Sequence, residues 1–326
     1  MAIAQSRKVE ISEIPVVDLG LLPQGAAAHA RLFGDMRDAC ESVGFFYVKN
    51  HGVSSADTAI IFEQCRRFFA IPMAEREALM LTRSPFYRGY LAIGARGANL
   101  DRPPDLLEAF NLGQDLGPDH PGVQAGKPLH GPNQWPSSLP GFREAVSAYQ
   151  AVMFTLANKL LRALAGSLAI SFESLAPYFE QPLSQMRLLH YPPQPSTLEH
   201  MMGARPHQDT SFLTILLQDA AGGLEVEARN GEWLAAPPRS DMFVVNVGEY
   251  LELFTSGVYY PAKHRVVNRS RVDRYSVPFF MSPNFDTELK PLPQFATQAG
   301  ARSFQPLHIG NDMARFFHSL WPSVAA

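Results

Sequence analysis

Hydrophobic residues recur every three or four positions in four stretches of the chain, which is the spacing of an α-helix with one buried face. The clearest stretch spans residues 140–166, and Gly166 at its end suits a helix C-terminal cap. The second helix in chain order begins at Ser54 with a Ser-x-x-Asp pattern that resembles a capping box. The same spacing predicts the three other helices at residues 28–42, 54–71 and 309–320.

After residue 179 the pattern changes to short apolar runs that are separated by turn-like Gly, Asn and Ser residues. These runs predict strands at residues 184–191, 211–217, 224–226, 232–234, 242–247, 264–267 and 274–281, in addition to earlier strands at 14–19 and 44–50. Several short strands at this spacing predict a sandwich or barrel, and not a parallel sheet that alternates with helices. Pro278 falls inside one predicted strand, so we expect a sheet edge or a bulge there.

Between residues 81 and 136 the periodicity fades, and Pro, Gly and Asp become frequent. A long irregular span in a compact protein is usually either functional or disordered. The aromatic residues Phe86, Tyr87, Tyr90 and Trp135 argue against plain disorder. Two interpretations stay open: loops that face a substrate, or loops that pack over the core.

Composition narrows the possible functions. The chain has 326 residues, enough to bury a sizeable core in one large domain or two. Its formal net charge is −3 and it contains no dense run of Lys and Arg, so we expect no nucleic-acid partner. The glycine-rich GxGxxG and GxxxxGK[ST] motifs do not occur, which leaves dinucleotide and P-loop sites without support.

The chain also lacks the sequence features of secretion and of membrane insertion. The N-terminal residues contain no apolar segment of the kind found in signal peptides. The most apolar region, residues 151–170, is interrupted by Asn158 and Lys159, so we expect no membrane span. The two cysteines, Cys40 and Cys65, lie in helical patterns and are expected to be buried free thiols. We therefore expect a cytoplasmic protein.

The candidate chemistry begins at His207 and Asp209, which precede the predicted strand at 211–217. Residues two apart on a strand point the same way, so an extended segment here presents an imidazole beside a carboxylate. His264, 55 residues after Asp209, completes a set of two histidines and one carboxylate. Such a set typically binds Fe(II) on one face and leaves the opposite positions open. His190 and His200 are rival ligands by residue type.

A second group of residues follows His264 by ten positions. Arg274 and Ser276 lie two apart on a predicted strand, and Phe280 shares their face by the same alternation. A guanidinium on an apolar wall is costly unless it has a partner. The distal carboxylate of a dicarboxylate would supply one through a bidentate pair, and a salt bridge to a protein Asp or Glu is the alternative.

These residues together resemble the iron(II)- and 2-oxoglutarate-dependent oxygenases, in particular the isopenicillin N synthase-like branch. The likeness covers most of the chain. It is carried by His207-x-Asp209, His264-Arg265-Val266, Arg274-x-Ser276 and the supporting motifs Ile14-Pro15-Val16-Val17-Asp18, Gly44-Phe45-Phe46-Tyr47-Val48, Tyr191-Pro192-Pro193, Gly222-Gly223-Leu224 and Asn246-Val247-Gly248.

The resemblance implies a mainly β fold: a double-stranded β-helix (jelly-roll) core with an α-helical N-terminal region and a long scaffold helix. It implies that His207, Asp209 and His264 bind the iron. Arg274 and Ser276 would bind the distal carboxylate of 2-oxoglutarate, with Tyr191 as a further donor.

The implied activity is a dioxygenase that uses Fe(II), 2-oxoglutarate and O2 to oxidise a C–H bond of a small organic molecule, with release of succinate and CO2. Hydroxylation, desaturation and ring closure are the possible outcomes. We name Tyr87, Phe212 and Phe280 as candidate walls of the substrate pocket. The expected partner is a small molecule, and the expected oligomeric state is a monomer or a weak dimer.

Four alternatives remain open. An isopenicillin N synthase-like oxidase would keep the iron without using 2-oxoglutarate, and an ethylene-forming variant would share the fold. A cupin-like zinc or manganese enzyme and a non-catalytic jelly-roll binding protein are the others.

The chain departs from many plant members of the family at Leu189, where they have Asn, so that cosubstrate contact is expected to be missing.

The resemblance also divides the chain into four segments. We expect an N-terminal helical and β region with substrate-side loops, then scaffold helices, then the catalytic core, and a C-terminal segment with its helix. Their bounds are residues 1–135, 136–180, 181–285 and 286–326.

Overall fold

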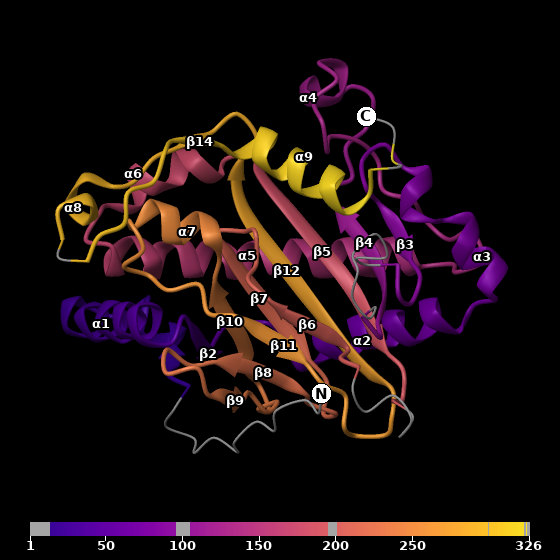
Figure 1. Ribbon diagram of the computed structural model, residues 1–326, viewed down its shortest axis with the longest axis horizontal. Coiled ribbons are helices and arrows are strands. Elements are labelled where there is room, and N and C mark those ends of the chain that lie inside the picture. The colour runs from indigo at the N-terminus through magenta and orange to yellow at the C-terminus, as the bar shows by residue number, and fades with distance from the viewer. Residues whose placement is uncertain (1–13, 96–104, 195–200, 299, 323, 325–326) are drawn as a thin grey trace.

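Two β-sheets form the centre of the molecule and face each other in a jelly-roll core (Figure 1). The computed structural model describes residues 14–95, 105–194, 201–298, 300–322 and 324. The eight-stranded sheet has the order β1-β2-β10-β7-β12-β5-β4-β3, and the four-stranded sheet has the order β6-β11-β8-β9. A further pair, β13 and β14, stands apart. Their bounds are β1 (Val16–Asp18), β2 (Phe45–Lys49), β3 (Gly89–Leu91), β4 (Glu108–Gly113), β5 (Pro182–Tyr191), β6 (Ala204–His207), β7 (Leu213–Gln218), β8 (Leu224–Glu227), β9 (Trp233–Ala235), β10 (Phe243–Val247), β11 (His264–Val266), β12 (Arg274–Asn284), β13 (Glu288–Leu289) and β14 (Leu307–His308).

Helices cover the eight-stranded sheet on the face away from the smaller sheet. The long α5 (Phe142–Ser167) lies behind the large sheet and packs against α1 (Ala26–Ser42) and α2 (Ser55–Ala70) (Figure 1). The C-terminal α9 (Ile309–Leu320) crosses near one end of β5 and β12. The shorter helices are α3 (Met73–Ala78), α4 (Pro121–Gln124), α6 (Phe172–Leu175), α7 (Glu249–Phe254) and α8 (Pro293–Ala296), with 3-10 turns η1 (Leu19–Leu21), η2 (Leu81–Arg83) and η3 (Ala176–Phe179).

The helices expected from hydrophobic spacing are present. Ser54 and Asp57 form the reciprocal capping box at the start of α2, since each side chain accepts a backbone N–H of the other. The expectation for Gly166 is wrong, because this residue lies inside α5, which continues to Ser167. A Cβ at Gly166 would collide with the Phe33 ring. The glycine therefore allows close packing of Phe33 of α1 against α5 and does not end the helix.

Two strands occur in the span that was expected to be irregular. β3 and β4 extend the eight-stranded sheet beyond β5, so part of residues 81–136 belongs to the sheet. All six residues of β4 are buried. A strand that is covered on both faces shows no polar alternation, which explains why the periodicity of this segment did not predict a strand.

The expectation for Pro278 is also wrong. β12 is a central strand, with β5 on one side and β7 on the other. The ladder to β7 is continuous through Pro278, which pairs with Leu216. The ladder to β5 omits Val277 and Pro278 and keeps the same register on both sides of them, and its one recorded shift lies farther along, between Ser282 and Asn284. The sheet thus accommodates the proline through a local gap in the ladder to β5, and the register does not shift at that point.

Several broader expectations can be compared with the fold. Cys40 and Cys65 are buried free thiols, as expected. Among the described residues no single helix is long and apolar enough to cross a membrane, and α5 passes that test only with the following residues 172–179 as a pair bent by 114°. Strands from the first and third predicted segments share the eight-stranded sheet. The division of the chain into four segments stays a prediction.

Candidate metal centre and cosubstrate pocket

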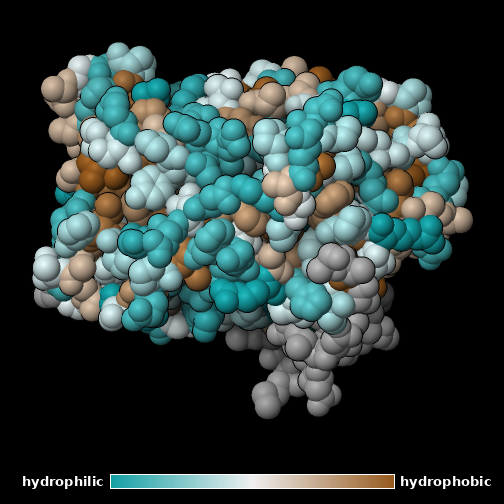
Figure 2. Space-filling view, turned by 90° about the horizontal axis from the view of Figure 1, so that it is seen from above, coloured by the Kyte–Doolittle hydropathy of each residue, from teal (hydrophilic) through white to brown (hydrophobic). Residues whose placement is uncertain are grey.

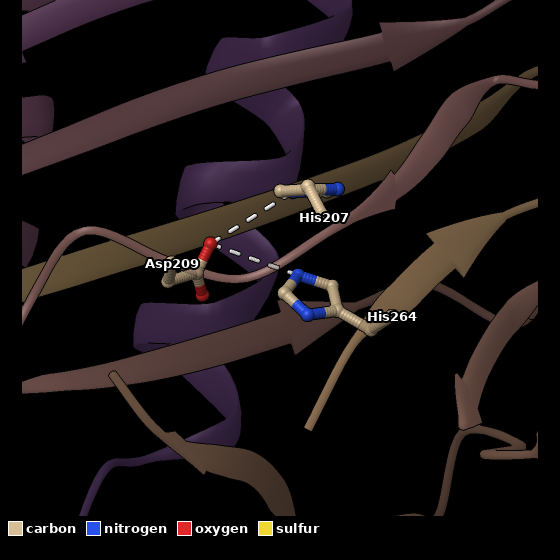
Figure 3. Close-up of side chains that lie close together, drawn as sticks. All are labelled: His207, Asp209 and His264. Atoms are coloured by element: carbon tan, nitrogen blue, oxygen red, sulfur yellow. Dashed lines mark ion pairs between the residues drawn. The ribbon is translucent and has the colours of Figure 1, made fainter. Parts of the chain in front are cut away.

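Three side chains converge between the two sheets. His207 ends β6 and His264 begins β11, and these two residues are direct cross-strand partners in the smaller sheet. Nε2 of His264 lies 3.6 Å from Oδ1 of Asp209, and Nε2 of His207 lies 3.8 Å from the same oxygen. Figure 3 shows both imidazoles turned toward that carboxylate oxygen. One nitrogen or oxygen from each residue falls within 4.8 Å of the others.

The sequence argument for His207 and Asp209 needs one correction. β6 ends at His207, so Asp209 lies in the turn that leads to β7 and not on a strand. Strand alternation therefore does not place the two side chains together. The turn folds the carboxylate back over the strand end, where hydrogen bonds hold it.

Contacts behind the three groups set their orientation. The Arg205 carbonyl accepts a hydrogen bond from Nδ1 of His207 at 2.6 Å, so Nδ1 carries a proton and Nε2 is the nitrogen that faces Asp209. Oδ2 of Asp209 accepts from Thr214 Oγ1 at 2.7 Å and from Asn246 Nδ2 at 2.9 Å. Oδ1 is thereby left to face the two imidazoles.

His264 is oriented by packing. Its ring meets the Phe45 ring edge to face at 5.3 Å between centroids, and its side chain is buried. Its Nδ1 is a buried atom with no hydrogen-bond partner among the described residues. Packing against Phe45, and not a hydrogen bond to Nδ1, therefore holds this imidazole near Asp209.

The electrostatics of Asp209 suit a metal ligand. Burial acts to raise the pKa of Asp209, but the charges of His264 and His207 and the hydrogen bonds from Asn246 and Thr214 lower it by more. The pKa of this carboxyl therefore lies below its ordinary value, and the group is a carboxylate at neutral pH. Two imidazole nitrogens and one carboxylate oxygen on one side of a cavity form the donor set that suits Fe(II).

The second half of the site is built around Arg274, which is 0% exposed. Its Nε donates to the Gly222 carbonyl, and its Nη1 donates to Ser276 Oγ at 3.2 Å. Among the described residues its buried Nη2 has no hydrogen-bond partner, and no Asp or Glu pairs with the guanidinium. The guanidinium lies 4.5 Å over the Tyr191 ring. A buried arginine with an unused donor fits an anionic oxygen group, such as the distal carboxylate of 2-oxoglutarate.

One cavity joins the two halves. It has an empty volume of about 670 Å³ and is lined by His207, Asp209, His264, Arg274 and Ser276, as well as by Tyr191 and Leu189. Strand alternation explains the floor of this cavity, since Arg274, Ser276, Pro278 and Phe280 of β12 all line it. The expectation that Arg274, Ser276 and Phe280 share a face is therefore confirmed.

Of the three candidate wall residues, one lines the cavity and two lie outside it. Phe280 lines the cavity, and its role as a wall of the substrate pocket stays a prediction. The expectation for Phe212 is wrong, because its fully buried ring packs between Phe179 and Phe254, at 5.0 and 5.6 Å, outside the cavity. β7 begins at Leu213, so Phe212 precedes the strand and its direction is not set by the strand's alternation. Tyr87 also lies outside the cavity, where it packs on Phe317 of α9 at 5.1 Å.

The rival ligands do not join the three groups. His190 is on β5 but bonds with Glu108 and Asp273, at 2.7 and 2.8 Å, and does not line the cavity. His200 lies outside the described residues.

Sequence reasoning missed several residues of the site. Asn246 occurs in a motif of the resemblance, but its bond to Asp209 depends on β10 lying beside β7, to which Thr214 belongs. Arg187 lines the cavity from β5, at the position two before Leu189 on the same face. Every second residue of β5, counted back from Tyr191, points to the same face, and this alternation could have identified Arg187.

Comparisons with known proteins agree with this geometry. The family model for the non-haem dioxygenase in morphine synthesis N-terminal region matches residues 14–138. The model for the 2OG-Fe(II) oxygenase superfamily matches residues 182–283.

Relatives align over most of their own length. The 2-oxoglutarate-Fe(II) type oxidoreductase hxnY of Emericella nidulans is 34% identical, over 89% of this chain and 84% of that protein. The 2-oxoglutarate-dependent dioxygenase citB of Monascus ruber is 36% identical, over 86% of this chain and 87% of that protein.

Solved structures share the fold. A Neurospora crassa protein, in complex with alpha-KG and thymine, superposes with a TM-score of 0.85 at 24% identity, over 96% of this chain and 99% of that one. A 2OG-Fe(II) oxygenase family protein of Caulobacter crescentus superposes with a TM-score of 0.81 at 29% identity, over 94% of this chain and 99% of that one. Family models, relatives and fold agree with the two-histidine, one-carboxylate geometry, and identify an iron-dependent enzyme with 2-oxoglutarate as cosubstrate. The chain therefore belongs to the 2OG-Fe(II) oxygenase superfamily and is a 2-oxoglutarate-dependent dioxygenase.

Proposed function

We propose that this enzyme oxidises a C–H bond of a small organic molecule at an iron held by His207, Asp209 and His264, with 2-oxoglutarate anchored by Arg274, Ser276 and Tyr191. The single observation that carries the residue assignment is the environment of the Arg274 guanidinium. It is fully buried, has an unused donor and no acidic partner among the described residues, and faces the same cavity as the three metal-ligand candidates. The distal carboxylate of 2-oxoglutarate would accept a hydrogen bond from that donor.

Each residue has a defined task in this proposal. Nε2 of His207, Nε2 of His264 and Oδ1 of Asp209 would hold the ion from the side of the smaller sheet and of the segment that follows β6. Arg274 and Ser276 would bind the distal carboxylate of the cosubstrate and so orient the molecule in the cavity. The bound Fe(II) and 2-oxoglutarate supply the activation of O2, with succinate and CO2 as coproducts. Apolar walls such as Leu189 and Leu216 keep water from the reacting centre.

The alternatives carry less support. Relatives over most of the chain have 2-oxoglutarate in their names, which favours its use here over an oxidase that dispenses with it. A donor set of two imidazoles and one carboxylate favours iron over a cupin-like zinc or manganese site. The intact set and the dioxygenase relatives disfavour a non-catalytic binding protein.

Three further expectations remain part of the proposal. Membership of the isopenicillin N synthase-like branch rests on the sequence motifs. A cytoplasmic location is supported by the buried free thiols of Cys40 and Cys65. The oligomeric state is proposed to be a monomer or a weak dimer.

The assignment is tested with three proteins loaded anaerobically with Fe(II). The wild type should bind 2-oxoglutarate and, on addition of O2, form succinate. His264→Ala should lose iron binding and succinate formation, because one of the three ligands is gone. Arg274→Gln should keep its iron but need at least about tenfold more 2-oxoglutarate, because a charge-assisted pair is worth about 1.5–3 kcal/mol.

Two matched controls accompany this test. His318→Ala and Arg66→Gln remove the same side-chain types at exposed positions on helices, and both should behave like the wild type. Iron retained by His264→Ala, or unchanged 2-oxoglutarate dependence in Arg274→Gln, would contradict the assignment of that residue.

A further inference from the structure

A small cavity lies at the end of the eight-stranded sheet where β3 and β5 begin and β4 ends. It has an empty volume of about 310 Å³, and its walls come from these strand ends and from residues 114–130, the segment that contains α4. Among the described lining residues, none also lines the cavity of the candidate metal centre. Leu183 is shared with a neighbouring cavity under α9, which Met313 and Phe317 line together with His207.

Arg88, the residue before β3, lines the small cavity and is 3% exposed. Its guanidinium lies against Gly113 of β4, where a Cβ would collide with it. Among the described residues, the one hydrogen bond of this side chain runs from Nη2 to the Leu129 carbonyl at 2.9 Å. Its Nε is buried and has no partner there. Most of the N–H donors of this guanidinium are therefore unused by the described part of the chain.

The charge of Arg88 also lacks an acidic partner among the described residues. Burial lowers the pKa of Arg88 to about 10, so the side chain remains charged at neutral pH. Asp115 is near enough to act on that pKa, but its oxygens are engaged elsewhere. Its Oδ1 accepts the Asn133 backbone N–H at 2.8 Å. Its Oδ2 accepts from Trp135 Nε1 at 3.1 Å and from Arg143 Nη2 at 2.7 Å. A buried charge without a paired counter-charge is costly, so this position favours an anion.

The rest of the wall is basic or neutral. Among the described lining residues there is no Asp or Glu, and two imidazoles, His120 and His130, are present. Nδ1 of His120 accepts the Gly122 backbone N–H at 3.1 Å, so its Nε2 carries a proton. Burial lowers the pKa of His130, and the charges of His120 and Arg88 act in the same direction. The cavity is therefore electropositive.

The size and chemistry of the cavity favour a small ligand. The face of the molecule that carries α4 and α9 is mostly hydrophilic, with hydrophobic residues in small scattered groups (Figure 2). It therefore lacks the contiguous apolar patch that is typical of a protein-binding surface. A guanidinium binds carboxylates and phosphates through two parallel N–H donors, and sulfate offers the same kind of oxygen acceptors.

We propose that this cavity binds a small oxyanion, held by the paired N–H donors of Arg88, at a site separate from those of iron and 2-oxoglutarate. The bound anion connects residues 114–130 to the beginnings of β3 and β5. The inference is independent of the proposed function, because no residue assigned to the iron or to 2-oxoglutarate lines this cavity among the described residues.

The test is isothermal titration calorimetry of the anaerobic Fe(II)·2-oxoglutarate enzyme, in which the cosubstrate already occupies the Arg274 site. Sodium sulfate represents inorganic oxyanions and sodium acetate represents carboxylates, each titrated at constant ionic strength maintained with sodium chloride. At least one of the two should give a saturable heat with one site per chain. Binding of sulfate alone, of acetate alone or of both identifies which oxyanions the site accepts. Amide hydrogen exchange in residues 114–130 should slow when the anion binds.

Arg88→Gln should weaken anion binding at least about tenfold, because a charge-assisted pair is lost. It should also abolish the change in hydrogen exchange. Arg31→Gln, at an exposed position of α1, is the matched control and should bind the anion normally. Arg274→Gln, titrated without 2-oxoglutarate, should also keep the affinity of the wild type.

A second variant avoids changing a buried residue. Gln181 is exposed and lines the same cavity, so Gln181→Glu adds a carboxylate there with little risk to the fold. This variant should bind the anion several times more weakly, because the new charge repels it and competes for Arg88. Gln298→Glu makes the same change at an exposed position before β14 and should bind like the wild type.

Three results would overturn the inference. If neither anion binds to the folded wild type, water alone satisfies the donors of Arg88. If binding persists in Arg88→Gln and disappears in Arg274→Gln, the anion occupies the cosubstrate site. If Arg88→Gln does not fold, Gln181→Glu decides, and an affinity equal to that of the wild type places the anion elsewhere.

Discussion

Asp209 uses its two carboxylate oxygens differently. Oδ2 accepts from Thr214 and Asn246, and Oδ1 faces His207 and His264. Because both donors come from neighbouring strands of the large sheet, they tie the turn that carries Asp209 to the core. In metal sites, hydrogen bonds to a ligating carboxylate orient the ligand and tune its basicity.

Asn246→Ala tests that arrangement. The variant removes one donor from Oδ2, so Asp209 gains freedom to turn and its charge is less stabilised. We expect Fe(II) affinity to fall by about 10- to 100-fold, measured by anaerobic titration. Asn230→Ala, in the exposed turn before β9, is the control and should bind iron normally. Unchanged affinity in Asn246→Ala would show that Thr214 alone suffices to hold the carboxylate.

On the scale of elements, the two faces of β5 have different roles. One face lines the cavities. The other face carries His190, whose Nδ1 bonds with Glu108 of β4 and whose Nε2 bonds with Asp273, just before β12. Glu108 also accepts from Tyr90 and Arg76. This network joins three neighbouring parts of the sheet directly behind Tyr191 and Arg274.

The network should make stability depend on pH. Burial acts to lower the pKa of His190, but the bonds with Glu108 and Asp273 raise it by more, so it lies above the ordinary value of 6.5. A raised pKa in the folded state means that the imidazolium stabilises the fold below pH 6.5, and that this contribution is lost as pH rises through the folded pKa.

His190→Gln cannot gain that charge. We expect its deficit in free energy of unfolding, relative to the wild type, to be largest near pH 6 and to shrink toward about pH 9. Urea unfolding at several pH values measures it. A deficit that grows with pH would mean that His190 is neutral in the folded protein.

α9 lies over a cavity beside the candidate metal centre, which His207 and Asp209 also line. Phe317 is buried, lines that cavity, and packs on Tyr87 and Trp321. Removing its ring both leaves a void and loosens the cover over that cavity.

Phe317→Ala should therefore lower the free energy of unfolding by about 3 kcal/mol, as for other buried phenylalanines. It should also raise the amount of succinate formed per substrate consumed, because a looser cover admits water to the reacting centre. Ser319→Ala, exposed on the same helix, should change neither quantity. A destabilised variant with unchanged coupling would limit α9 to a structural role.

On the scale of the whole molecule, the site lies between the two sheets. His207 and His264 belong to the smaller sheet, Arg274 and Ser276 belong to the larger one, and Asp209 lies in the turn that connects β6 to β7. Iron and 2-oxoglutarate together would therefore link both sheets through one cavity. Ligands that bind only the folded state add stability in proportion to the logarithm of their concentration.

Thermal unfolding under anaerobic conditions should follow that rule. At 100 times its dissociation constant, each ligand should add about 2.7 kcal/mol, first Fe(II) and then 2-oxoglutarate. In Arg274→Gln the increment from iron should remain, and at the same 2-oxoglutarate concentration the second increment should be smaller. An equal second increment in both proteins would show that 2-oxoglutarate does not depend on Arg274.

Local sequence was sufficient to predict much of the secondary structure of this protein. The helices followed from hydrophobic spacing, and the alternation of β12 placed Arg274, Ser276 and Phe280 on one face, because strand geometry depends only on neighbouring residues. Local sequence could not place β4, whose residues are all buried, or Phe212, which precedes its strand by one position.

The motifs by themselves determined the family, the candidate ligands and the candidate cosubstrate residues, since patterns such as His207-x-Asp209 and Arg274-x-Ser276 can be read from a few neighbouring residues. Tertiary structure decided the rest. The turn at Asp209 brings the carboxylate to histidines from two strands, and β10 supplies Asn246 from a distant part of the chain. The packing of α9 closes the cavity that Phe317 lines together with His207 and Asp209. These contacts join segments far apart in sequence, so they depend on how the sheets and helices pack and not on any local pattern.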